Sequence, residues 1–190
     1  MSDLDLKRAS KFIALILRHK PEVAGLTLDA EGWTDVEDLL RGLRAAGRPL
    51  SRDELAPLVE ADAKGRYALS PDGQRIRAQQ GHSVAVDLRL QAATPPLRLY
   101  HGTVRSVLDA ILVEGLRKMQ RHHVHLSPDV ETATAVGARR GNPVILEVDA
   151  AAMTADGYAF LRSANGVWLT DAVPPQYLRL HRAEAALPHT

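Results

Sequence analysis

A short segment near the middle of the chain, Ala92-Ala93-Thr94-Pro95-Pro96, constrains the fold more than any other feature of the sequence. Two consecutive prolines break both helices and sheets, because proline has no backbone N–H and restricts the residue before it. The 190 residues are enough for one domain or two small ones, at about 150 residues per domain. We therefore expect two lobes, residues 1–93 and residues 94–190.

The pattern before this segment predicts three helices followed by a hairpin. The expected helices cover residues 3–19, 35–46 and 51–61, and the expected strands cover 66–69 and 76–78. Pro21 ends the first helix, and Ser51 with Glu54 forms a capping box for the third. The strands flank Asp72-Gly73, a common hairpin turn. Three helices and a hairpin are typical of a winged helix.

Beyond the proline pair the pattern changes to short apolar strands around two helices. Strands are expected over 97–101, 124–126, 144–148, 167–170 and 177–180, and helices over 104–115 and 128–138. This mixture predicts an α+β fold with a split, sheet-rich core in the second lobe. Residues 183–190 are expected to fray.

The composition excludes several classes of protein. Hydrophobic residues make up 45% and charged residues 25%, which is enough to bury a core. Cysteine is absent, so disulfides, thiolate metal sites and a cysteine nucleophile are excluded, which fits a reducing cytoplasm. Because no apolar run approaches about 20 residues and no signal-peptide pattern is evident, we expect a cytoplasmic protein with no membrane span.

The charge is nearly balanced, with 24 Lys+Arg against 23 Asp+Glu. The residues before position 94 contain 14 basic and 14 acidic side chains. An extended basic surface for nucleic acid is therefore excluded, although a local basic pocket is not. The basic residues are 19 Arg and only 5 Lys. Arginine binds phosphate through two parallel hydrogen bonds, but GC-rich codon usage would explain the same bias.

Two groups of polar residues in the first lobe could bind an anion. Arg18, His19 and Lys20 lie together at the end of the first helix, where cations also stabilise the helix dipole. Arg75 and Arg77 share one face of the returning strand by its period of two, although arginine is also common at exposed sheet edges. The turn that follows contains further polar side chains: Gln80, Gly81, His82 and Ser83.

Three further groups lie in the second lobe. They are Tyr100-His101-Gly102-Thr103, His122-His123-Val124-His125-Leu126-Ser127 and the pair Arg139-Arg140. His123 and His125 point the same way in a strand, but no third metal ligand is evident and catalytic zinc usually needs three, so no metal is expected. Ser127 before Pro128 is the expected N-cap of the following helix. Arg139 and Arg140 could equally complement a helix dipole.

Taken in order, these motifs closely resemble those of the RNA 2′-phosphotransferase family of the KptA type. The resemblance rests on Leu17 to Pro21, Gly32-Trp33, Ile76 to Ser83, Tyr100 to Thr103 and His125 to Ser127, and it covers residues 5–180. It implies a winged-helix lobe that binds RNA phosphate and an ADP-ribosyltransferase-like lobe that binds NAD. The implied reaction is NAD-dependent removal of an internal RNA 2′-phosphate through a 2′-phospho-ADP-ribosylated RNA intermediate. Its products are 2′-OH RNA, ADP-ribose 1″,2″-cyclic phosphate and nicotinamide.

The resemblance also implies the roles of individual residues. The catalytic set carried over to this chain is Arg18, His19, Arg77 and Arg139, and a slip of one residue would select Arg140 instead of Arg139. The implied NAD-binding residues are His101, Gly102, Thr103, His125, Leu126, Ser127 and Val167. The residues expected to contact the substrate are Lys20, Arg75, Gln80, Gly81, His82, Ser83 and Arg140. Because the four catalytic positions come from both halves, the expected site lies between the lobes.

Two other functions remain open from the sequence. One is an ADP-ribosyltransferase that modifies terminal phosphates of RNA or DNA and stops at the adduct. The other is a winged-helix binding module whose second lobe is degenerate, although the catalytic residues fall in both lobes. The expected partner is a 2′-phosphorylated RNA, and one chain is expected to suffice as a monomer.

Overall fold

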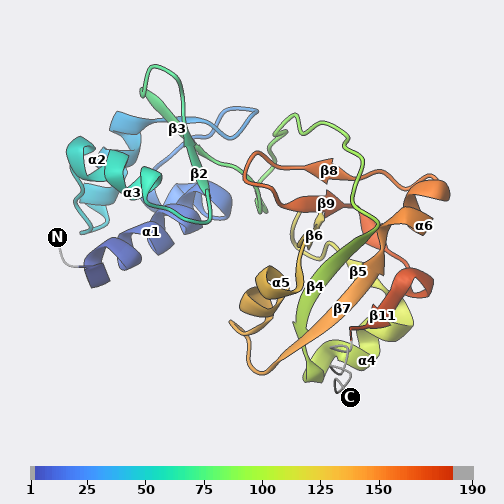
Figure 1. The fold of residues 1–190 in the computed structure, drawn as a ribbon. Helices are drawn as coiled ribbons and strands as arrows, with labels where there is room; N and C mark the ends of the chain where they lie inside the picture. The colour runs from blue at the N-terminus through green and yellow to red at the C-terminus, as the bar shows by residue number, and fades with distance from the viewer. Residues whose placement is uncertain (1–2, 182–190) are drawn as a thin grey trace, which may run out of the picture. The chain divides into compact units, whose positions relative to one another are not determined.

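The computed structural model describes residues 3–181, which form two compact units and confirm the expected α+β class. Unit 1 consists of residues 3–90 together with Gln120–His122 and Ser163–Gly166, and unit 2 contains the remaining described residues. Together they form six α-helices and four small antiparallel sheets (Figure 1). None of the helices in this described part is long and apolar enough to cross a membrane.

The three helices expected in unit 1 are confirmed. They are α1 (Asp3–Arg18), α2 (Val36–Ala45) and α3 (Arg52–Glu60), and a short 3-10 helix, η1 (Pro21–Ala24), follows α1. α2 begins after Asp35, whose carboxylate accepts a hydrogen bond from the backbone N–H of Glu37. α3 begins with the predicted capping box, in which the Ser51 hydroxyl and the Glu54 carboxylate each accept from the other residue's backbone N–H.

Unit 1 also contains a three-stranded antiparallel sheet with the order β1-β3-β2. Its strands are β1 (Thr34–Asp35), β2 (Tyr67–Leu69) and β3 (Arg75–Ala78). β2 and β3 are the expected hairpin, whereas β1 was not predicted because two residues give no periodic signal. Along β3, Ile76 and Ala78 are buried and alternate with Arg75 and Arg77, so the two arginines share the opposite face.

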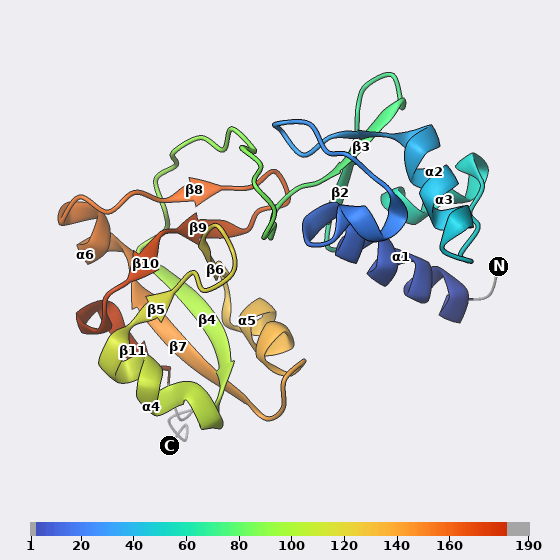
Figure 2. The same ribbon diagram turned by 180° about the vertical axis from the view of Figure 1, so that it is seen from behind.

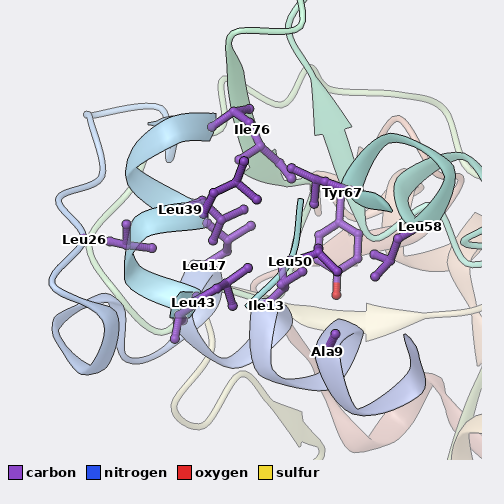
Figure 3. Packing of buried hydrophobic residues seen from close by; sticks show 14 of the residues in the cluster. Ala9, Ile13, Leu17, Leu26, Leu39, Leu43, Leu50, Leu58, Tyr67 and Ile76 are labelled. Atoms are coloured by element: carbon purple, nitrogen blue, oxygen red, sulfur yellow. The ribbon is translucent and has the colours of Figure 1, made fainter. Parts of the chain in front are cut away.

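The core of unit 1 joins the end of α1 to β3. Figure 3 shows Ile13 and Leu17 of α1 packed with Leu39 of α2 and Ile76 of β3, and all four side chains are inaccessible to solvent. Closely packed interiors hold the backbone of neighbouring residues rigidly. The residues that directly follow Leu17 and Ile76 in the chain are therefore placed by this core.

Unit 2 is built from short antiparallel sheets and three helices (Figure 2). Its strands are β4 (Arg98–Val104), β5 (Leu116–Arg117), β6 (Val124–Leu126), β7 (Pro143–Asp149), β8 (Leu161–Arg162), β9 (Trp168–Thr170), β10 (Ala172–Val173) and β11 (Leu178–Leu180). Its helices are α4 (Arg105–Glu114), α5 (Val130–Gly137) and α6 (Ala150–Ala155), with the 3-10 helix η2 (Pro175–Tyr177). The sheets have the orders β11-β7-β4, β6-β9-β8 and β10-β5.

The strands and helices expected in this half are present, but five short elements were missed and one cap was assigned wrongly. β5, β8 and β10 have two residues each, η2 has three and α6 has six, too few for a periodic pattern. Ser127 is not the N-cap of α5, because its backbone still pairs with Tyr100 in a β-bridge. The cap is Asp129, which accepts from the backbone N–H of Thr132 at 2.6 Å. The expected fraying of 183–190 lies outside the described residues.

α5 packs very closely against β4, and this contact depends on two glycines. A Cβ atom on Gly102 of β4 would lie 1.8 Å from the carbonyl oxygen of Ala133 in α5. A Cβ atom on Gly137, the last residue of α5, would lie 3.1 Å from the carbonyl oxygen of Thr103. The backbones of helix and strand are therefore nearly in contact, and glycine at 102 has a packing reason independent of any ligand.

Candidate functional site

The guanidinium of Arg18 is buried at the C-terminal end of α1. Among residues 3–181, its Nε and Nη2 atoms are buried without a hydrogen-bond partner. The group lies against the backbone of Gly81, where a Cβ atom would be 3.8 Å from the Arg18 Nε and Cζ atoms. Gly81 has φ +85°, a conformation that glycine adopts without strain. Burial lowers the pKa of Arg18, which indicates a cation poorly solvated by water.

Arg77 and Arg75 lie over the same tryptophan but differ in their partners. The Arg77 guanidinium carbon is 4.6 Å from the centre of the Trp33 ring, and that of Arg75 is 5.4 Å away. Arg75 is exposed and pairs with Asp29 at 3.6 Å. Arg77 is half-buried, its Nη1 is 3.5 Å from the Glu31 carbonyl oxygen, and its Nε has no partner in the described structure. Arg77 is thus the arginine of the pair whose charge no carboxylate of residues 3–181 balances.

The segment after β3 is fastened to the end of α1. The backbone N–H of Ser83 donates to the Arg18 carbonyl at 2.9 Å, and the Ser83 hydroxyl lies 2.9 Å from Nδ1 of His19. Between these contacts and β3 lies His82, whose side chain is 1% exposed. Unit 1 therefore brings together the predicted residues at the end of α1 and those that follow β3, with Lys20 exposed beside them and Gln80 half-buried.

His82 is surrounded by basic groups. Burial is the main cause that lowers its pKa, to about 4, and the charges of Arg18, His122, His19 and Arg77 add to the effect. Burial and the charge of Arg18 also lower the pKa of His19. At neutral pH the His82 ring is consequently uncharged, and it carries one N–H donor and one acceptor nitrogen.

This pKa predicts how stability depends on pH. As the pH falls below 6.5, the unfolded chain binds a proton at His82, whereas the folded protein does not until about pH 4. The stability that neutral His82 contributes is therefore retained above pH 6.5 and lost as the pH falls towards 4. His82 alone should lower the free energy of unfolding by about 2 kcal/mol between pH 7.5 and pH 5. Urea unfolding of the wild type and His82→Phe at both pH values measures this, and equal pH dependence in the two proteins would contradict it.

Two residues lie near this cluster although the sequence pattern did not place them there. Arg121 and His122 belong to a segment between β5 and β6 that folds as part of unit 1. The charge of Arg121 contributes to the lowered pKa values of Arg18 and His19, and His122 contributes to that of His82. In the sequence His122 is merely one member of a histidine tract, and only the tertiary fold brings the segment to unit 1.

In unit 2 the two histidine motifs lie on strands that touch. Tyr100 of β4 and Ser127 after β6 exchange backbone hydrogen bonds of 2.9 and 2.8 Å. The Nδ1 atom of His101 is 3.1 Å from the His125 carbonyl oxygen, and Nδ1 of His125 is 3.1 Å from the His123 carbonyl oxygen. A carbonyl only accepts, so both Nδ1 atoms donate, and in each neutral ring Nε2 is the acceptor atom.

The other predicted residues of unit 2 have varied environments. Thr103 and Leu126 are buried, and Val167 is half-buried directly before β9. Arg139 and Arg140 are exposed in the turn that follows α5, so the choice between them stays a prediction. No group of three or more His, Asp or Glu residues in the described part of the chain is arranged to hold a metal ion.

Comparison with known proteins gives a consistent result over nearly the whole chain. The family model described as "RNA 2'-phosphotransferase, Tpt1 / KptA family" matches residues 5–172. A probable RNA 2′-phosphotransferase of Hahella chejuensis is 56% identical over 178 residues, which cover 94% of this chain and 96% of the relative. Another, from Streptomyces griseus, is 57% identical over 180 residues, or 91% of this chain and 95% of the relative. A third, from Streptomyces coelicolor, is 58% identical over 172 residues, which cover 90% of this chain and 93% of the relative.

These matches agree with what the site can do chemically. Arg18 and Arg77 provide guanidinium groups with buried, unpaired nitrogens suited to a phosphate, and His19 provides a titratable ring beside them. The matched residues include both units, so the similarity is not confined to one motif. The chain therefore belongs to the Tpt1/KptA family and is an enzyme, an RNA 2′-phosphotransferase.

Proposed function

We propose that this enzyme removes an internal 2′-phosphate from RNA in an NAD⁺-dependent reaction, with unit 1 binding the phosphate and unit 2 binding NAD⁺. The supporting observation is the Arg18–Arg77–His82 cluster, in which five buried side-chain nitrogens have no hydrogen-bond partner within residues 3–181. Buried polar atoms are almost always paired in proteins, so such a cluster is accounted for by a ligand rich in acceptors. A phosphate monoester brings three acceptor oxygens and up to about two negative charges.

The basic residues of unit 1 have different roles in the reaction of the phosphate. Arg18 and Arg77 bind its oxygens, because a planar guanidinium donates two parallel hydrogen bonds to an oxyanion. Negative charge builds up on these oxygens during transfer, and buried cations stabilise it more strongly than exposed ones. His19, held by Ser83, takes up the proton of the hydroxyl group that attacks the phosphorus and transfers it to the departing 2′-oxygen of the RNA. A phosphate monoester is itself a nucleophile, so no general base is required to activate it.

The remaining predicted residues have supporting roles in this proposal. Arg139 is the fourth catalytic residue in this proposal. The residues proposed to contact the RNA around the phosphate are Lys20, Arg75, Gln80, Gly81, His82, Ser83 and Arg140. Because one chain supplies this whole set, a monomer suffices.

The residues of unit 2 fit a dinucleotide with ribose hydroxyl groups. His101 and His125 each use Nδ1 to donate to a backbone carbonyl, so in the neutral ring Nε2 is the nitrogen that accepts hydrogen bonds. A ribose hydroxyl is a donor that suits such an acceptor. We propose that these histidines hold NAD⁺ together with Gly102, Thr103, Leu126, Ser127 and Val167. When bound, NAD⁺ supplies the ADP-ribosyl group that accepts the phosphate.

We also propose a specific architecture for the two units. The three helices and antiparallel hairpin of unit 1 support a winged-helix lobe for RNA. The paired strands β4 and β7 and the separate sheet β6-β9-β8 support an ADP-ribosyltransferase-like lobe.

The proposed reaction is tested with an oligonucleotide that carries one internal 2′-phosphate. We expect the protein to convert it to 2′-OH RNA only when NAD⁺ is present, and to do so equally well in the presence of EDTA. Mass spectrometry of the products, with nicotinamide measured in parallel, checks both expectations. Turnover without NAD⁺, or loss of turnover with EDTA, would contradict the proposal.

The same assay separates the main alternative from the proposed reaction. An ADP-ribosyltransferase specific for terminal phosphates would leave the internal 2′-phosphate in place. It would instead add the mass of one ADP-ribose to an oligonucleotide with a terminal phosphate. A matched oligonucleotide with a 5′-phosphate and no 2′-phosphate therefore completes the experiment.

A further inference from the structure

His82 has an unusual environment for a buried histidine. Elsewhere in this protein His101 and His125 donate to backbone carbonyls, and His181 lies 3.5 Å from the Glu147 carboxylate. His82 is 1% exposed, yet neither of its ring nitrogens has a hydrogen-bond partner among the described residues. Leaving both nitrogens buried in this way destabilises the folded protein. If His82 had only a structural role, an apolar side chain at this position would make the folded protein more stable.

The ring of His82 lies beside the backbone of Gly32, and the residues on both sides of His82 in the chain contact Arg18. A Cβ atom on Gly32 would lie 3.4 Å from Nε2 of His82, so the ring lies next to the backbone there. Its own backbone is fixed as well, because Gly81 lies against Arg18 and the Ser83 N–H donates to the Arg18 carbonyl. The two nitrogens are therefore presented in a defined orientation and not simply left in a loose interior.

The charges of the groups that face His82 determine whether the site favours an anion or a cation. Arg18 and His19 approach it from the end of α1, Arg77 from β3, and His122 from the segment between β5 and β6. All four are basic, so the environment favours an anion. The neutral ring adds one N–H, a donor that an anionic oxygen can accept. Nitrogens of Arg18 and Arg77 are likewise buried and unpaired within residues 3–181, so all three side chains suit one oxyanion.

We propose that His82 donates a hydrogen bond to the 2′-phosphate of the RNA and fixes that phosphate against Arg18 and Arg77. This inference rests on the proposed function, because it takes the phosphate of unit 1 to be the substrate. It gives the two histidines of the site different tasks. His19 moves a proton, whereas His82 stays neutral and positions the group that is transferred.

Two apolar variants, His82→Leu and His82→Phe, test the proposal. The loss of one hydrogen bond to a charged group should lower kcat/KM on the 2′-phosphorylated oligonucleotide by about 10- to 100-fold. The melting temperature of at least one variant should equal or exceed that of the wild type, because no internal partner is lost. Leucine and phenylalanine differ in size, so the test does not depend on whether the larger phenylalanine ring fits against Gly32.

Two polar variants identify the donating nitrogen. Asparagine places its amide near the position of Nδ1, and glutamine places its amide near that of Nε2. We expect either His82→Asn or His82→Gln to recover part of the lost kcat/KM. If neither variant exceeds the two apolar variants in kcat/KM, the proposed hydrogen bond is refuted.

His181→Phe is the matched control, because His181 has an internal partner and lies outside the proposed site. This variant should lower the melting temperature and leave kcat/KM unchanged, which is the reverse of the result expected at His82. The proposal is overturned if both apolar His82 variants melt several degrees lower and lose activity in parallel. It is equally overturned if they retain wild-type kcat/KM. Failure of the wild type to remove the 2′-phosphate would instead reject the proposed function itself.

A direct readout comes from the imidazole NMR signals of His82, assigned by their absence in His82→Phe. Addition of the 2′-phosphorylated oligonucleotide without NAD⁺ should shift these signals and raise the pKa of His82, because a bound anion favours the protonated ring. Unchanged His82 signals at saturating oligonucleotide would contradict the proposal.

Discussion

Alanine in place of Arg77 is expected to lower kcat/KM for removal of the 2′-phosphate by at least about 1,000-fold, because it removes charged hydrogen bonds from the transition state. The fold should be almost unaffected. The Arg77 side chain makes a cation–π contact with Trp33 and one long contact with the Glu31 carbonyl, and such a cation–π contact contributes about 0.5–1 kcal/mol. The melting temperature should therefore fall by less than about 4 °C. Steady-state kinetics and thermal unfolding of the same preparation measure both quantities.

Arg75 provides a matched comparison for this experiment. It lies on the same face of β3 and over the same Trp33 ring, but Asp29 balances its charge. Arg75→Ala should therefore reduce kcat/KM much less than Arg77→Ala. Arg77→Lys should not restore activity, because an ammonium group cannot donate in the planar, bidentate manner of a guanidinium. If Arg77→Ala kept a tenth or more of the wild-type turnover, Arg77 would not be a catalytic residue.

Gly102→Ala should strongly destabilise unit 2. The added Cβ atom would lie 1.8 Å from the Ala133 carbonyl oxygen, which belongs to a helix backbone and cannot turn aside. Overpacking of this kind costs about 3 kcal/mol or more, which corresponds to a fall in melting temperature of about 6–12 °C for a chain of this length. Thermal unfolding followed by circular dichroism measures the effect.

Gly157→Ala is the control for Gly102→Ala. Gly157 has φ +89° and open space around it, so alanine there introduces backbone strain without a clash. We expect a smaller fall in melting temperature for Gly157→Ala. The difference between the two variants then gives the part of the Gly102→Ala effect that comes from packing against α5. A Gly102→Ala protein with normal stability and weakened NAD⁺ binding would show instead that glycine is required for the cofactor alone.

The sequence predicted long or well-capped elements accurately and missed short ones. α3 was predicted because Ser51 and Glu54 form a capping box that is visible in the sequence. β5, β8 and β10 were missed because pairing with distant strands, and not local preference, makes two residues a strand. The cap of α5 was misplaced because Ser127 fits the local pattern, whereas its pairing with Tyr100 is a tertiary contact.

The candidate site was predictable only in part, for a similar reason. The alternation along β3 placed Arg75 and Arg77 on one face, but nothing local indicated that Asp29 would pair with Arg75. Arg121 joins unit 1 through the path of a loop that no sequence periodicity describes. The sequence therefore indicated which side chains suit the chemistry, while their burial and partners depend on contacts between distant segments.

The hydrogen bonds between Ser83 and the end of α1 have a consequence for how the site is assembled. His19 and Ser83 are 64 residues apart in the sequence, yet their side chains are hydrogen-bonded, and the neighbouring Arg18 carbonyl accepts from the Ser83 backbone. The last turn of the first helix is thus completed by a segment that is synthesised much later. A fragment that stops before residue 83 would contain Arg18, His19 and Arg77, but it would lack the contacts that hold the first two in place. The phosphate binding proposed for unit 1 therefore requires the whole folded unit, and we expect no shorter peptide from it to bind the phosphate.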